Sequence, residues 1–73
     1  MQQDELVQLG KRIKSLRKKR KLTLGALCYR NGLEPSTISR IEAGIVEAKY
    51  LTLLKIAKAF GITLSEMLNI SDN

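Results

Sequence analysis

The sequence predicts an all-α fold of five helices and no strands. Three observations lead to this prediction: apolar residues recur at three- and four-residue intervals, helix-capping residues precede the apolar segments, and glycines follow them. At 73 residues the chain is expected to form one domain over residues 1–73. Its core is expected to extend from about residue 6 to residue 69.

The first helix is predicted from about Asp4 to Arg20. Leu6, Leu9, Ile13 and Leu16 follow the spacing of one helix face. Acidic residues at its start and a basic run at its end suit the helix dipole.

Two short helices are predicted next, joined by a tight turn. Thr23 is a good N-cap for a helix over residues 24–31, which Gly32 is expected to end. Pro35 suits the first position of a third helix, because its missing N–H has no helical partner there. Gly44 is expected to end that helix.

Residues 23–43 therefore have the spacing of a helix-turn-helix. Ile38 and Ile41 are expected to face the core, which leaves Ser36, Thr37, Ser39 and Arg40 around the outer side. A major groove about 12 Å wide accepts one α-helix, so this geometry in a basic chain favours sequence-specific DNA binding.

A strongly apolar fourth helix is predicted over residues 50–60, and it should be the most buried element. Tyr50 is expected at the edge of the core. Thr63 and Glu66 form a capping-box pattern, which predicts a short fifth helix over residues 64–69.

Composition narrows the function. Thirteen Lys and Arg against seven Asp and Glu give a net charge of +6, which favours a polyanionic partner such as double-stranded DNA. An enzyme is not expected, because histidine, a glycine-rich phosphate loop and spaced carboxylate pairs are lacking. The single Cys28 is expected to pack in the core, and neither a metal site nor a cofactor nor a small-molecule ligand is predicted.

Membrane association is not expected either. No apolar run approaches the ~20 residues of a spanning helix, and the first residues lack the pattern of a signal peptide. A cytoplasmic protein is therefore predicted.

Three separated segments resemble the phage repressor and Cro-like helix-turn-helix family, often called XRE-like, over about residues 9–68. The matching residues are Leu16-Arg17 with Leu22-Thr23, residues 36–42 with Gly44, and residues 53–62. The resemblance implies a compact five-helix, lambda-repressor-like DNA-binding domain. Such domains are usually dimeric, and their third helix enters the major groove.

The resemblance also implies the positions of DNA contacts. Pro35, Ser36 and Arg40 fall where the family contacts bases, and the fork of Arg40 suits guanine O6 and N7. Backbone phosphates are expected to be contacted by the following residues: Lys18, Lys19, Lys21, Thr23, Thr37 and Ser39. The lysines belong to a run with eight positive residues in eleven. Taken alone, the run favours a solvated helix face, and the match to a helix-turn-helix reverses this preference.

A structural ion pair between Arg17 and Glu42 is implied by the same resemblance. It would tie the first helix to the end of the third. A plain interpretation of Arg17 as one more member of the basic run is the alternative.

Several residues depart from the family pattern. Leu24 stands where glutamine is usual, and Glu34 places a negative charge close to phosphates. Ile45 and Val46 are expected to expose apolar surface unless another subunit or the fifth helix covers them. The C-terminal Met67, Leu68 and Ile70 fit either the core or a dimer contact.

The sequence thus predicts a transcriptional regulator, a homodimeric repressor or autoregulator on an inverted-repeat operator. Its half-sites would lie about 34 Å apart. The alternative is a protein-interaction module, antitoxin-like or an adaptor, whose DNA recognition is weakened and whose partner is another protein.

Overall fold

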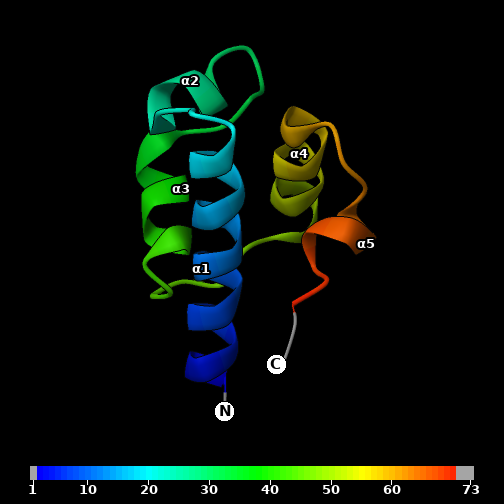
Figure 1. The fold of residues 1–73 in the computed structure, drawn as a ribbon. Coiled ribbons are helices and arrows are strands. Elements are labelled where there is room, and N and C mark those ends of the chain that lie inside the picture. The colour runs from blue at the N-terminus through cyan, green and yellow to red at the C-terminus, as the bar shows by residue number, and fades with distance from the viewer. Residues whose placement is uncertain (1, 71–73) are drawn as a thin grey trace.

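Five helices form the fold in the computed structural model, which describes residues 2–70. All regular elements in that range are helical, as predicted, and Figure 1 shows their arrangement. The helices are α1 (Gln2–Lys19), α2 (Leu24–Cys28), α3 (Pro35–Glu42), α4 (Tyr50–Phe60) and α5 (Leu64–Met67).

The core forms where α1 packs against α3. The remaining side of the core is covered by α4 and α5 (Figure 1). Ile13, Ile38 and Ile56 have no exposed surface, so each of the three longer helices contributes at least one fully buried isoleucine. The full set of buried apolar residues is Ile13, Leu16, Leu27, Cys28, Ile38, Ile41, Ile56, Ala57, Phe60 and Met67.

Gly10 permits the close approach of α1 to the end of α3. A Cβ atom built on Gly10 would overlap the carbonyl oxygen of Ile41 and lie 2.8 Å from the carbonyl carbon of Glu42. No side chain larger than hydrogen fits there without moving one helix away from the other.

The prediction that α2 extends to Asn31 is wrong, because α2 ends at Cys28. Tyr29 has extended backbone angles, and Arg30 adopts a φ of 61°. Asn31 Nδ2 donates to the carbonyl oxygens of Leu27, at 2.6 Å, and Tyr29, at 3.2 Å. An asparagine side chain that satisfies these carbonyls competes with continued helix, so Gly32 lies in the turn and does not end the helix.

The prediction that α4 is the most buried helix is wrong for its first turn. Tyr50 and Leu51 are 64% and 67% exposed, so Tyr50 is not a core-edge residue. Leu51 lies off the stripe of Ile56, Ala57 and Phe60 that faces the core. Tyr50 precedes the part of α4 that covers the core.

The predicted capping box starts α5. Thr63 Oγ1 accepts from the Glu66 N–H at 3.0 Å, and Glu66 Oε1 accepts from the Thr63 N–H at 2.9 Å. The Thr63 N–H and the Thr63 hydroxyl both donate to Glu66 Oε1, and these two hydrogen bonds lower the pKa of Glu66. Met67, with no exposed surface, belongs to the core, whereas Leu68 is 40% exposed.

Candidate nucleic-acid interface

The outer face of α3 is polar and free of the core. Pro35, Ser36, Ser39 and Arg40 are exposed, whereas Ile38 and Ile41 on the opposite side are at most 1% exposed. The spacing of 36, 39 and 40 places these three side chains on one helix face. Arg40 therefore has a long cationic side chain on a surface that no other described helix covers.

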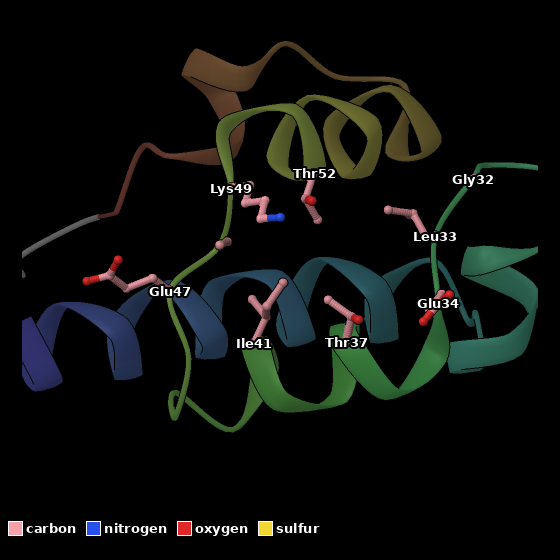
Figure 2. Close-up of a pocket in the computed structure, with 9 residues that line it drawn as sticks. Gly32, Leu33, Glu34, Thr37, Ile41, Glu47, Lys49 and Thr52 are labelled. Carbon is pink, nitrogen blue, oxygen red and sulfur yellow. The ribbon is translucent and has the colours of Figure 1, made fainter.

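Thr37 faces a different direction from this polar face. It is half-buried and lines a groove between α3 and α4 together with Ile41 and Thr52. Figure 2 shows Thr37 and Ile41 pointing from α3 toward α4, with Lys49 pointing into the groove from the other side. The structure thus separates Thr37 from the exposed residues with which it was grouped.

The structure brings Arg17 and Glu42 together in a two-point ion pair. Arg17 Nε lies 2.7 Å from Glu42 Oε2, and Nη2 lies 3.0 Å from Oε1. The two side chains are 11% and 7% exposed. The hydrogen bond to Glu42 raises the pKa of Arg17, which stays protonated at any pH at which the protein folds.

Arg17 also fixes the start of the helix-turn-helix. Its Nη1 donates to the carbonyl oxygen of Leu22 at 2.7 Å, one residue before the N-cap of α2. The same side chain therefore joins α1, the entry to α2 and the last residue of α3. These contacts set the position of α3 relative to the rest of the fold.

Thr23 caps α2 with its side chain. Its Oγ1 accepts from the Ala26 N–H at 3.0 Å and remains exposed. The hydroxyl proton is still available to donate to an anion. The equivalent cap of α3 differs, because Glu34 makes no side-chain hydrogen bond to the first turn.

The basic run of residues 11–21, in α1 and the turn that follows it, divides into two sets of side chains. Arg12 donates to the carbonyl oxygens of Glu66 and Met67 at 2.9 and 3.0 Å. Arg20 donates to the carbonyl oxygen of Phe60 at 3.2 Å and lies 5.0 Å from the centre of the Phe60 ring. Neither contact was predicted from the sequence. The only indication in the run is the choice of residue, because positions 12, 17 and 20 are arginine and the other basic positions are lysine.

The lysines of the run are exposed. Lys18, Lys19 and Lys21 take no part in the side-chain hydrogen bonds and ion pairs found among residues 4–70. Lys21 has a φ of 56° in the turn that leads into α2. Three exposed cationic side chains thus lie beside the entry to the helix-turn-helix.

Two other predictions concern chemistry outside this surface. Cys28 is buried, and burial raises the pKa of its thiol, which suits a packing role. Within the described range, no cluster of three metal-ligating side chains occurs. None of the helices there is both long and apolar enough to cross a bilayer.

Of the two apolar residues expected at the surface after α3, one is exposed. Ile45 is 67% exposed, whereas Val46 packs partly against the core. The expectation for Val46 is therefore only partly met.

A short α2, a tight turn and an α3 with an exposed polar face define a DNA-binding helix-turn-helix domain of the phage repressor and Cro-like class. The chain belongs to the helix-turn-helix domain family, whose model matches residues 10–72. This confirms the predicted family and five-helix fold. The class consists of DNA-binding regulators and not of enzymes.

Solved structures agree with this assignment. The restriction-modification controller protein C.AhdI from Aeromonas hydrophila is 30% identical, with a TM-score of 0.83 over 88% of this chain and 97% of its own. The clp gene regulator ClgR from Corynebacterium glutamicum is 25% identical, with a TM-score of 0.79 over 86% of this chain and 67% of its own.

A third similar structure is larger. The HTH_3 family transcriptional regulator from Vibrio cholerae is 28% identical, with a TM-score of 0.84 over 92% of this chain. The match spans 38% of that regulator. A search of curated proteins gives no match.

Proposed function

We propose that the protein is a dimeric transcriptional regulator, a repressor or autoregulator, that binds an inverted-repeat operator by placing α3 in the major groove. The main support is the exposed face of Ser36, Ser39 and Arg40, on a helix whose position is fixed by the Arg17–Glu42 pair. The similarity to C.AhdI, described as a controller protein, supports a regulatory role.

In this proposal Arg40 is the strongest base contact. Its planar guanidinium donates two parallel hydrogen bonds to guanine O6 and N7, worth about 1–3 kcal/mol of discrimination. Pro35 and Ser36 contact neighbouring base edges at the N-terminal end of α3. Ser36 discriminates less, because a hydroxyl both donates and accepts.

Phosphate contacts come from the elements around α3. Lys18, Lys19 and Lys21 are exposed beside the entry to α2, and the hydroxyls of Thr23 and Ser39 are exposed as well. Thr37 is the weakest member of this set, because it is half-buried in the groove beside α4. A phosphate would reach its backbone N–H more readily than its hydroxyl.

A dimer would place two copies of α3 in successive major grooves, about 34 Å apart. Leu51 and Leu68, 67% and 40% exposed, are apolar surface that a second copy would cover. A single strong base contact per subunit gives limited discrimination, so two half-sites would add specificity.

The test is to retain fragmented host DNA on the purified protein near physiological salt and to sequence the bound fragments. An enriched inverted repeat that the Arg40→Ala variant no longer selects is the expected result. Sedimentation of the protein with the selected site measures how many subunits bind. Retention without any sequence preference would contradict the proposal.

A second candidate function is a protein-interaction module. The exposed side chains of Ile45, Tyr50 and Leu51, each at least 64% exposed, favour it, because a partner protein would cover them. Under this hypothesis a protein co-purifies with the chain and protects residues 45–51 from proteolysis. Tight operator binding by the chain alone would argue against it as the whole function.

A further inference from the structure

Glu34 is an acidic residue at the start of α3, the proposed recognition helix. Its side chain contributes no hydrogen bond and no ion pair to the fold among the described residues. It is the N-cap residue of α3, yet its carboxylate makes no hydrogen bond to the first turn. It is exposed and is absent from the ion pairs among the described residues. Only its backbone contributes, through a carbonyl that accepts from the Ile38 N–H at 3.1 Å.

Glu34 lies at the end of α3 from which helix-turn-helix proteins contact bases. The N-terminal residues of a recognition helix are those that reach base edges in the major groove. Glu34 directly precedes Pro35 and Ser36, which are exposed at that same end of α3. A carboxylate there meets either phosphate oxygens, which repel it, or hydrogen-bond donors on the bases.

The chemistry of those donors selects a base. In the major groove, cytosine presents the N4 amino group as a donor, and a glutamate oxygen is a suitable acceptor for it. We propose that Glu34 is a specificity-determining residue that accepts a hydrogen bond from a cytosine N4 in each half-site. Its charge then lowers affinity for DNA in general and restores affinity at sites with that cytosine.

This inference rests on the proposed regulator function and adds one base to what α3 recognises. Arg40 and Glu34 have opposite requirements, because one donates to guanine and the other accepts from cytosine. Two such contacts on one short helix would discriminate more strongly than Arg40 alone. The negative charge of Glu34 would then lower the affinity for non-cognate sequences, which lack the cytosine donor.

The experiment compares binding sites selected from a random DNA pool by the wild type, Glu34→Ala and Glu47→Ala. Glu47 is a matched control, because it is also exposed and lies at the opposite end of the groove beside α3 (Figure 2). Both variants remove one negative charge and so raise non-specific affinity similarly. Only Glu34→Ala is expected to lose a cytosine preference while it keeps the guanine preference attributed to Arg40.

A second measurement uses the selected wild-type site. Replacing the cytosine with each other base is expected to weaken wild-type binding at least roughly fivefold, and to leave Glu34→Ala binding nearly unchanged. A cytosine preference that persists in Glu34→Ala, or selected sites without one, would overturn the inference and leave the regulator proposal intact. Selection of no common sequence by the wild type would overturn both.

Discussion

The arginines and lysines of residues 11–21, in α1 and the turn that follows it, are mixed in the sequence but have different surroundings in the fold. Arg12, Arg17 and Arg20 bind carbonyl or carboxylate oxygens of other segments. The lysines between them are exposed. One run of like charge therefore contains a set that holds the fold together and a set that is free for a partner.

The difference follows from side-chain chemistry. Guanidinium presents five donors in a rigid plane, so it can bond two acceptors at once, whereas the ammonium of lysine is compact and strongly hydrated. The last carbonyls of a helix have no partner within that helix. Arg12 supplies donors to the end of α5, and Arg20 does so at the end of α4. A run of basic residues therefore cannot be interpreted as a DNA-binding surface until it is known which of its arginines bond to acceptors within the protein.

The first prediction compares the Arg17–Glu42 pair with the exposed lysines, and it has the largest expected difference in folding stability. Glu42→Ala would leave a cation about nine-tenths buried without its partner, and loss of one member of a buried pair costs about 3–5 kcal/mol. Urea unfolding followed by circular dichroism measures this loss. Lys14→Ala, which removes an exposed charge from the same helix, is the control and should shift stability by less than about 0.5 kcal/mol. Equal stability of the two variants would contradict the division of α1 into two sets.

The second prediction concerns the close contact of α1 with the end of α3, which brings Arg17 within reach of Glu42. Gly10→Ala would force a methyl group against the backbone of Ile41 and Glu42. Overpacking of this kind costs about 1–3 kcal/mol. Gly25→Ala is a matched control, because no atom lies within 4 Å of a Cβ built there in α2. It should stabilise the protein slightly through helix propensity, so a similar loss from both substitutions would refute the argument.

The third prediction tests whether geometry or charge matters at the arginine positions. Arg20→Lys keeps the positive charge but loses the planar contact with the Phe60 carbonyl and ring. A loss of about 1 kcal/mol is expected in thermal or urea unfolding. The same exchange in the opposite direction, Lys19→Arg, should leave stability unchanged. If Arg20→Lys is neutral, the carbonyl contact contributes nothing measurable.

The overall fold could be predicted because its signals are local. The apolar spacing of α1 and the capping box of Thr63 and Glu66 each specify structure within a few residues. The end of α2 could not be predicted, because it depends on the Asn31 side chain competing for backbone carbonyls. Glycine was the stronger signal in the sequence, but asparagine ended the helix.

The site was predicted less completely than the fold. Helical spacing correctly placed Ser36, Ser39 and Arg40 on one exposed face, but the position of Thr37 depends on how α4 packs beside α3. The exposure of Tyr50 likewise depends on how far α4 extends beyond the core. Contacts between distant helices, such as that of Arg12 with α5, leave no trace in local spacing. The choice of arginine in place of lysine is their only sign.

The smallest change in stability is expected for the lysines, and their effect should appear in DNA binding. Lys19→Ala should alter the free energy of unfolding by less than about 0.5 kcal/mol, because the side chain is exposed. If Lys19 contacts a phosphate, its loss should reduce the slope of log affinity against log salt by about one. Lys14→Ala removes the same charge one turn and a half earlier on α1, farther from the entry to α2, and should leave that slope nearly unchanged. Equal slopes for both variants would mean that the lysines act only through the net charge, and the phosphate-contacting set would then have to be sought among Thr23, Ser39 and the first turn of α3.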